Sequence, residues 1–577
     1  MVERNSEETA INRSDLFEDF VRSKLGDPKF LEDKPESYLE SLFLSKRDQK
    51  IRKEKGQFMT PIQIAHLMVD MALLNNKITQ ESLLDPSVGL GIFPLLYLKK
   101  RADLGLIDGL SIVAYDIDKI MLDITKARLD RFEKNNGINL SLRNEDFVLS
   151  EDSTTYDVII CNPPYIKSNL VKNRENYLKH LRSRYGFEIP TLNNLDSFFL
   201  LKSLKLLKPG GTLIFITPNG FLSSVSGTKV REYLLKEIDI EAFIHIDTPE
   251  FVFEDGMSSA LITYGKKKKD QPKVQNVKFI KIVKFNGIAE VIEAIKTGTI
   301  LLPNTVQTYP QTELNPKEKW LSKFEEIHNP SVGKIEFVEL RKYFRVKRGI
   351  ATGANSYFTL SVDQVKKWHI PDKYLEPIIV KASYASSPIF TYDDYVALKK
   401  SGKRVFLLKI EDEEPNQEVS DYLNYGIKLG VDRKYLCRNR RKWFFMENRD
   451  PPVLFVKVFQ REKPEFILNK AGVKNLTCFH GLYPKIQNET LYKALILYSF
   501  TTYGGKSIIE QTRKYGGGLF KLEPRDVEQI KIPDFLQFSE NDLKGIDDLF
   551  DSFWKIGYEK LKEKSQLLFD SIFENAE

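Results

Sequence analysis

The sequence predicts an α/β protein whose first half is a doubly wound, mostly parallel sheet. Short β-branched runs such as 158–160 alternate with apolar-periodic segments of helical length such as 121–132, which is typical of parallel strands joined by helices. Acidic residues and glycines follow several of these runs, at the sheet edge where such folds bind ligands. The composition changes after residue 300, so a second domain is expected.

Length, charge and cysteine usage limit the classes of protein that fit. A chain of 577 residues is too long for one compact domain and allows about two to four. Its formal charge of +7 permits a polyanionic partner without demonstrating one. Three widely spaced cysteines and six unclustered histidines predict neither a disulfide framework nor a zinc site. No apolar run reaches membrane-spanning length, and we expect a cytoplasmic protein.

The first fifty residues are predicted to form a charged helical extension. In the following segment, Gly56–Pro61, Thr60 is placed to cap a helix that has Pro61 at its first position. A ligand carboxylate could lie at the positive amino end of that helix, although an ordinary capped helix explains the same residues equally well.

Asp85 ends the first predicted strand, and Gly89 and Gly91 follow in a loop that a ligand can approach closely. Pro94 stands where a dinucleotide-binding motif has its third glycine, which counts against NAD. The carboxylate of Asp85 is suited instead to a cationic amine.

Two further strands also end in acidic residues. Asp116 can accept both ribose hydroxyls of a nucleoside ligand, whereas Asp118 is better explained as a helix cap. Asp146 and Phe147 follow a third short strand and can bind the amine and the ring face of an adenine. Each of these two alone is more often a turn aspartate or a core phenylalanine.

The stretch 157–165 reads Asp-Val-Ile-Ile-Cys-Asn-Pro-Pro-Tyr and organises the first domain. Its prolines end a buried strand and leave Asn162 and Tyr165 at the strand's carboxyl end. The side-chain carbonyl of Asn162 and the backbone carbonyl of Pro163 can then converge beside an aromatic ring. Two acceptors and a stacking surface fit a planar base that carries an exocyclic amine.

The remaining segments carry weaker signals. Residues 167–184 are polar and basic, and we expect a mobile loop over the site. Prolines punctuate residues 301–335, the predicted linker. Residues 437–445 mix cations with aromatic rings, which is typical of phosphate-binding segments, although a surface strand with snorkelling arginines explains them equally well. Residues 542–572 are predicted to form one long amphipathic helix.

Taken together, these residues resemble the amino-group DNA methyltransferases of bacterial restriction–modification systems, in the class with the catalytic domain first and the target-recognition domain last. The resemblance rests on five motifs in that class's order: Gly56-Gln-Phe-Met-Thr-Pro, Asp85-Pro-Ser-Val-Gly-Leu-Gly-Ile-Phe, Tyr115-Asp-Ile-Asp, Asn162-Pro-Pro-Tyr and Gly349-Ile-Ala-Thr-Gly-Ala-Asn.

The resemblance implies a Rossmann-like catalytic domain dependent on S-adenosylmethionine over residues 51–300 and, after the linker, a mixed α+β target-recognition domain over 336–537. The helical extension over 1–50 and the C-terminal helix over 538–577 are predicted from the sequence pattern alone.

It also implies roles for individual residues. The residues expected to hold the target base are Asn162, Pro163, Tyr165 and Phe253, of which Tyr165 and Phe253 stack on it. The residues expected to bind S-adenosylmethionine are Thr60, Asp85, Gly89, Gly91, Asp116, Asp146 and Phe199. The composition of the 437–445 segment predicts DNA contacts from Arg438, Arg440 and Arg441.

The expected reaction is methyl transfer, without a metal, to the N6 amine of an adenine flipped out of double-stranded DNA. A tyrosine in the last place of the motif favours adenine in the resembling class, and N4 of cytosine stays open. Methylation of RNA or of a protein glutamine stays open as well, as does a non-catalytic DNA-binding specificity subunit. A cognate restriction endonuclease, where one exists, is expected on a separate chain.

Overall fold

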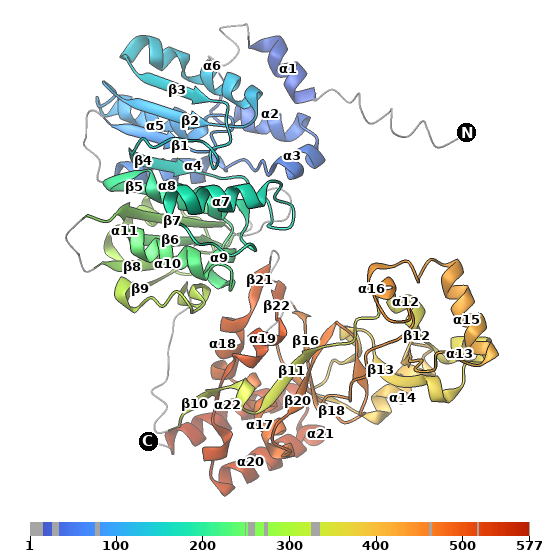
Figure 1. Ribbon diagram of the computed structural model, residues 1–577. Helices are drawn as coiled ribbons and strands as arrows, with labels where there is room; N and C mark the ends of the chain where they lie inside the picture. The colour runs from blue at the N-terminus through green and yellow to red at the C-terminus, as the bar shows by residue number, and fades with distance from the viewer. Residues whose placement is uncertain are drawn as a thin grey trace, which may run out of the picture. The chain divides into compact units, whose positions relative to one another are not determined.

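The chain folds into two compact units, Met1–Ile327 and His328–Glu577. The computed structural model (Figure 1) describes residues 16–25, 34–74, 81–248, 250–251, 260–269, 275–324, 335–460, 464–515 and 519–575. None of the helices in these ranges is both long and apolar enough to cross a membrane.

The first unit contains a nine-stranded sheet in the order β3-β2-β1-β4-β5-β7-β6-β8-β9. Its strands are β1 (Ser82–Asp85), β2 (Ser111–Tyr115), β3 (Asn139–Arg143), β4 (Tyr156–Cys161), β5 (Leu207–Thr217), β6 (Ile238–Ile246), β7 (Ala260–Lys267), β8 (Asn276–Ile282) and β9 (Thr305–Pro310). The five strands from β3 to β5 are parallel neighbours, and β7 lies antiparallel between β5 and β6. The strand order reverses between β1 and β4, which is where doubly wound sheets bind ligands.

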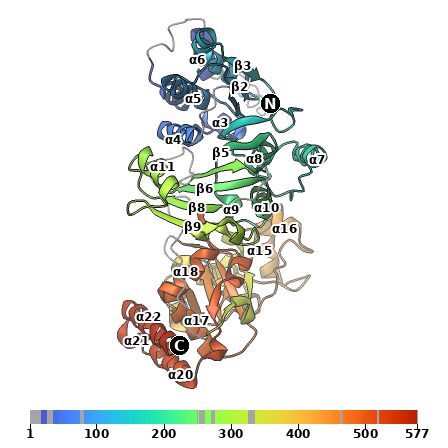
Figure 2. The ribbon, with the colours of Figure 1, turned by 90° about the vertical axis from the view of Figure 1, so that its left-hand side faces the viewer.

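Helices cover both faces of this sheet, as the two views in Figures 1 and 2 show. One face carries α4 (Ile62–Leu73), α5 (Ile92–Asp103), α6 (Lys119–Asn136) and α11 (Ile288–Thr297). The other carries α7 (Arg174–Tyr185), α8 (Leu195–Lys205) and α10 (Thr228–Glu237). Val158 and Ile160 of β4 belong to the first core and Ile159 and Cys161 to the second, because successive strand residues point to opposite faces. The prediction of a doubly wound sheet is confirmed.

In the described ranges before α4, the chain forms α1 (Leu16–Lys24), α2 (Tyr38–Lys46) and α3 (Gln49–Lys55). Apolar residues of the first two, including Phe17 and Phe43, form a separate small core with Ile120, Met121 and Ile124 of α6. The helices α1 and α2 are therefore packed on the helix that follows β2.

The second unit is mixed α+β, as expected, and is built around two sheets. A five-stranded sheet has the order β11 (Phe344–Arg348), β20 (Phe479–Pro484), β16 (Leu454–Lys457), β18 (Phe466–Asn469) and β14 (Ile389–Phe390). It shares a core with α17 (Glu489–Phe500), α18 (Thr502–Gln511), α19 (Pro524–Glu528), α20 (Glu540–Asp551), α21 (Phe553–Ile556) and α22 (Tyr558–Glu574).

A second sheet has the order β12 (Thr359–Leu360), β15 (Phe406–Leu408), β13 (Leu375–Ile379) and β19 (Lys474–Asn475). Around it lie α12 (Asn355–Phe358), α13 (Val362–Trp368), α14 (Tyr392–Lys400), α15 (Gln417–Lys428) and α16 (Tyr435–Arg438). Two smaller ladders pair β10 (Phe337–Glu339) with β23 (Lys531–Pro533), and β22 (Leu519–Lys521) with β17 (Phe459–Gln460) and β21 (Arg513–Tyr515). Figure 1 shows α12–α16 gathered in one lobe of this unit and α20–α22 in another.

The structure differs from the expectations for the C-terminal helix and for the linker. The single helix predicted over 542–572 is wrong: Gly557 separates α21 from α22 with a φ of 78°, and a positive φ cannot continue an α-helix. The segment predicted as a linker, 301–335, contains β9, which pairs antiparallel with β8, and Trp320, which is fully buried in the core of the first unit.

Candidate active site

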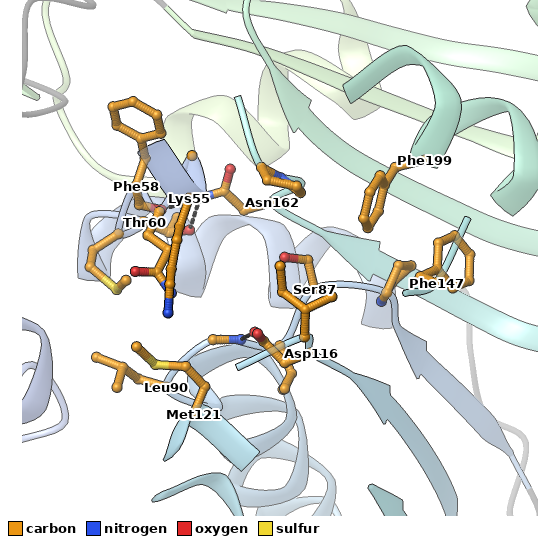
Figure 3. A pocket seen from close by; sticks show the side chains of 18 of the residues that line it. Lys55, Phe58, Thr60, Ser87, Leu90, Asp116, Met121, Phe147, Asn162 and Phe199 are labelled. Atoms are coloured by element: carbon orange, nitrogen blue, oxygen red, sulfur yellow. Dashed lines mark hydrogen bonds between the residues drawn. The ribbon is translucent and has the colours of Figure 1, made fainter. Parts of the chain in front are cut away.

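A cavity lies at the carboxyl ends of β1, β2 and β4, and residues 55–60 form the part of its wall beside Asn162 (Figure 3). Of the residues expected at the site, those that line it are Thr60, Gly89, Asp116, Asp146, Asn162 and Phe199. Those that lie outside its lining are Asp85, Gly91, Pro163 and Tyr165, and Phe253 lies outside the described residues. Within the described ranges, no cluster of three His, Cys, Asp or Glu side chains could hold a metal ion.

The side chain of Asn162 is held in one orientation. Its amide nitrogen donates hydrogen bonds to the backbone oxygen of Phe58 and to Oγ1 of Thr60, both at 2.9 Å (Figure 3). Because a backbone carbonyl can only accept, the nitrogen and not the oxygen must face Phe58. The amide oxygen, Oδ1, is buried and has no hydrogen-bond partner in the part of the chain that the structure describes. A buried acceptor without a partner costs free energy that a ligand donor can recover.

Thr60 differs from the expected helix cap. The N-cap residue of α4 is Pro61, and no side chain caps this helix. The Thr60 hydroxyl instead accepts the hydrogen bond from Asn162, because the Asn162 amide reaches it at the carboxyl end of β4. Thr60 therefore lines the cavity and also orients Asn162.

Tyr165 lies against the same segment. Its ring stacks on Phe58 with centroids 5.3 Å apart and planes 28° apart, and its hydroxyl donates to the backbone oxygen of Ile216 at 3.1 Å. Gly56 has a φ of 66° and lies so close to Ile166 that a Cβ on residue 56 would be 2.8 Å from Cγ1 of Ile166. Both the backbone conformation and the contact favour glycine at this position.

Asp116 connects the glycine-bearing loop to the end of β2. Its Oδ2 accepts a hydrogen bond from the Gly89 backbone nitrogen at 3.0 Å, and its Oδ1 accepts one from that of Asp118 at 2.8 Å. Burial raises the pKa of Asp116 to about 6. Each carboxylate oxygen keeps a second lone pair, so the ionised group can also accept hydroxyl donors from a ligand.

Asp85 is fully buried beside Pro86 and Ser87, which line the cavity. Its Oδ1 accepts a hydrogen bond from the Ser87 backbone nitrogen at 3.2 Å, whereas its Oδ2 has no partner among the described residues. Burial raises the pKa of Asp85 to about 8. Gly91 has a φ of 77°, and a Cβ there would lie 2.8 Å from Oγ1 of Thr125 on α6, so this glycine allows the loop to pack closely.

The loop after β3 presents Asp146 and Phe147 to the cavity and is braced by α8. Lys202 is fully buried, and its ammonium donates to the backbone oxygens of Phe147 and Ser150, both at 2.6 Å, and to Oγ of Ser150 at 2.8 Å. Burial lowers the pKa of Lys202 to about 8. The Phe147 ring packs against Phe199 with centroids 5.3 Å apart, and the two rings lie on one side of the cavity in Figure 3.

The mobile loop predicted over 167–184 is wrong for its second half, where α7 forms. The two buried residues of this helix, Tyr177 and Leu181, are four positions apart, and this spacing places both on one face. The Tyr177 hydroxyl donates to Oδ2 of Asp146 at 2.6 Å, and Tyr177 lines the cavity. The segment therefore contributes to the wall of the site.

Asp118 joins the N-terminal helices to the site. Its Oδ2 accepts hydrogen bonds from Arg47 at 2.8 Å, from Lys55 at 2.9 Å and from Gln57 at 3.3 Å. It occupies the N-cap position of α6, as the sequence suggested, but its side chain makes no capping bond there. Burial favours the neutral acid, yet the contacts with Lys55 and Arg47 outweigh it and lower the pKa of Asp118.

Sequence reasoning missed several residues of the cavity lining, among them Lys55, Phe58 and Ile117. Ile117 is 65% exposed and offers the cavity an apolar surface next to Asp116. Its position directly after an acid at a strand end is the signal that could have indicated it.

The three arginines expected to contact DNA have different surroundings. Arg440 donates to the backbone oxygens of residues 351 and 352, at 2.7 and 3.0 Å, and so supports a neighbouring loop. Arg441 forms an ion pair with Glu413, and Arg438 is exposed at the end of α16. The segment forms a short helix and turns, and not a surface strand.

Comparisons with known proteins place these features in a family. The model for the Eco57I restriction-modification methylase matches residues 90–253, and that for the C-terminal domain of the Type II methyltransferase M.Eco57I matches residues 322–556. The Type II methyltransferase M.AccI of Acinetobacter calcoaceticus is 33% identical over 488 residues, which are 83% of this chain and 85% of that protein. The chain belongs to the Type II DNA methyltransferases of restriction–modification systems.

The resemblance inferred from the motifs is thereby confirmed. A second relative of this methyltransferase, M.XamI of Xanthomonas campestris pv. amaranthicola, is 24% identical over 485 residues, 83% of this chain and 85% of its own. The solved structure of the Type IIL restriction-modification enzyme MmeI in complex with DNA gives a TM-score of 0.57 at 12% identity, covering 93% of this chain and 78% of that chain. At this identity the likeness shows the fold alone.

S-adenosylmethionine is the cofactor of this methyltransferase, and the groups around the cavity fit it. The molecule carries a cationic amine, ribose hydroxyls and an adenine. The structure offers Oδ2 of Asp85, which has no partner among the described residues, the carboxylates of Asp116 and Asp146, and the rings of Phe147 and Phe199.

Proposed function

We propose that this methyltransferase transfers a methyl group from S-adenosylmethionine to the N6 amine of an adenine flipped out of duplex DNA. The observation that carries the proposal is the amide of Asn162, whose nitrogen is occupied and whose buried oxygen has no partner among the described residues. An exocyclic amine is the kind of donor that this oxygen lacks.

In the proposed mechanism, Oδ1 of Asn162 and the backbone oxygen of Pro163 accept the two hydrogens of the amine. An aromatic amine is a poor nucleophile because its lone pair is delocalised into the ring, and two fixed acceptors favour a pyramidal nitrogen whose lone pair is available. S-adenosylmethionine supplies a methyl group on a positively charged sulfur. The bonds from Asn162 to Phe58 and Thr60 keep the acceptor oriented before the base arrives.

A stacked base cannot reach this site, so flipping is part of the proposal, at a cost of about a few kcal/mol. Tyr165 would offset part of this cost by stacking on the base. Its ring is fixed by Phe58 on one side and by its hydroxyl bond to Ile216, so the opposite ring face would receive the base. We propose that Phe253 stacks on the target base as well.

The proposed contacts to S-adenosylmethionine follow the positions described above. Asp116 would accept the ribose hydroxyls, Asp146 the adenine amine and Asp85 the cationic amine, while Phe199 packs on the adenine. Thr60 and Gly89 line the same cavity, and Gly91 would act through the packing of the loop.

We assign catalysis to the first unit and DNA target recognition to the second, and place any cognate restriction endonuclease on a separate chain. MmeI, whose fold this chain shares, was solved in complex with DNA, which supports double-stranded DNA as the partner. Methylation assays on DNA, RNA and protein substrates test this choice, and activity on RNA or protein alone would contradict it.

Asn162→Ala tests the catalytic assignment. We expect methyl transfer to fall by ~10²–10³, while S-adenosylmethionine affinity changes by only a few fold, because the substitution removes the amine acceptor and leaves the carboxylates in place. Asn416→Ala, at an exposed asparagine of the second unit, is the matched control. Single-turnover methylation at the wild-type rate by the Asn162 variant would contradict the assignment.

Mass spectrometry of nucleosides from DNA methylated by the protein identifies the base. N6-methyladenine is the expected product. N4-methylcytosine would retain the role of Asn162 and overturn the choice of adenine, since both bases carry an exocyclic amine.

A further inference from the structure

We infer that the second unit holds one sugar–phosphate strand of DNA in a basic groove on its α12–α16 lobe. The inference rests on the proposed function, which makes DNA the polyanionic ligand. It assigns the phosphate contacts to residues other than Arg440 and Arg441. We define the basic groove by its four cations, Arg348, Lys367, Arg404 and Lys434.

The groove consists of two adjoining hollows. The first, of about 450 Å³, is lined by residues of α12, α13 and α15 together with Arg404 and Lys434. The second, of about 440 Å³, is lined by Arg348, residues 351–356 and Lys434, among others. Because Ser356 and Lys434 line both hollows, the two adjoin, and a linear ligand that lies along Lys434 can contact both.

The charge of the groove has one sign. None of the described residues that line either hollow is acidic. Within the described part of the chain, Arg348, Arg404 and Lys434 form no ion pair, whereas Arg441 is paired with Glu413. Uncompensated cations along a groove attract a chain of negative charges such as a phosphodiester backbone.

Aromatic rings form one wall of the first hollow. Tyr357 and Tyr422 are buried, stack with centroids 4.7 Å apart, and each donates its hydroxyl to the other's backbone oxygen at 2.8 Å. Next to Tyr422 lie Trp368 and Tyr425, with centroids 5.0 Å apart, and Tyr425 is 40% exposed. Nucleic-acid-binding grooves commonly combine aromatic rings, which contact the bases, with cations, which contact the phosphates.

The Gly349–Asn355 motif forms the wall of the second hollow. Arg440 holds the carbonyls of residues 351 and 352, and a Cβ at Gly349 would lie 2.1 Å from the backbone oxygen of Leu476. Gly353 has a φ of 76°, which favours glycine. The motif is thus a tight turn anchored by Arg440, and its residues 351–355 line the groove.

The test is the salt dependence of binding to a fluorescein-labelled DNA duplex of arbitrary sequence. The groove variant neutralises Arg348, Arg404 and Lys434 together (R348Q/R404Q/K434Q). The charge-matched control, K544Q/K560Q/K564Q, neutralises exposed lysines of α20 and α22 in the other lobe. Removal of one phosphate contact lowers the slope of log affinity against log salt by ~0.9, so the slope should fall by ~2–3 in the groove variant and stay unchanged in the control.

Each outcome decides the inference. Wild-type slopes in both variants would overturn it, as would equal decreases in both, which would show a diffuse charge effect. The single substitution Lys434→Glu, at an exposed position shared by both hollows, should reproduce the weakening if the triple variant fails to fold. Wild-type protein that binds duplex RNA and no DNA would contradict the proposed function itself, whereas DNA methylation with an unchanged groove slope would contradict only this inference.

Discussion

The unpartnered oxygen of Asp85 leads to a prediction about protons released on cofactor binding. Asp85 is buried with a pKa of about 8, so in the ligand-free protein it is mostly protonated at neutral pH. If its Oδ2 receives the cationic amine of S-adenosylmethionine, the nearby positive charge lowers the pKa and the acid ionises. Binding should therefore release a proton into the solution.

The size of this release follows from the pKa. With a ligand-free pKa of about 8, Asp85 carries ~0.9 proton at pH 7 and ~0.5 at pH 8. Complete ionisation on binding releases these amounts. The ligand's own amine titrates near pH ~8 and contributes an uptake of the opposite sign, which is small at pH 7 because most of the free amine is already protonated.

Calorimetry in buffers of different ionisation enthalpy measures the number of protons released. The comparison is between wild type and Asp85→Asn, which is isosteric and has no carboxyl proton to release. We expect a difference of ~0.9 proton per cofactor at pH 7 that falls as the pH rises. Equal release by the two proteins would refute the placement of the amine at Asp85.

Three further predictions concern the same domain. Asp116→Ala should weaken S-adenosylmethionine binding by about 1.5–3 kcal/mol, the worth of hydrogen bonds to a charged acceptor; unchanged affinity in a titration would move the ribose contact elsewhere. Asp118→Asn should lower the free energy of unfolding by about 2 kcal/mol or more, since the ion pairs of Asp118 with the buried Arg47 and with Lys55 are lost, and the exposed pair Glu18–Arg22 provides a control, Glu18→Gln, that should change the melting temperature little. The free energy of unfolding of the ligand-free protein should fall by about 2 kcal/mol between pH 6.5 and 8. Burial raises the pKa of Asp85 to about 8 and that of Asp196 to about 7, so these groups bind more protons in the folded than in the unfolded protein over this window. A melting temperature that rises from pH 6.5 to 8 would contradict this prediction.

The sequence predicted the central sheet because strands buried on both faces are uniformly apolar, as Val158–Ile160 are. It did not predict β9, whose residues are mostly polar and only partly buried. This strand exists because β8 offers it a ladder, which is a tertiary effect. Likewise, the two buried residues of α7, Tyr177 and Leu181, form too narrow an apolar stripe to stand out in a basic segment.

The acids and glycines at strand ends were predictable because their position relative to the sheet follows from the strand pattern alone. The contacts that orient them were not. Thr60 and Asn162 are 102 residues apart, and no local pattern connects them. The same holds for Lys202, which reads as an ordinary helix lysine but is fully buried beneath the Asp146 loop.

The three hydrogen bonds from Lys202 to the loop after β3 also bear on how fast the cofactor can bind. A loop that is already fixed loses its conformational freedom when the chain folds, and not when the ligand arrives. In the proposed site, the adenine then meets Phe147 and Asp146 in their final places, so association needs no closure of this loop and should follow a single exponential phase. The lifetime of the complex would then be set by how strongly the fixed groups bind the cofactor, and affinity would vary through the rate of dissociation.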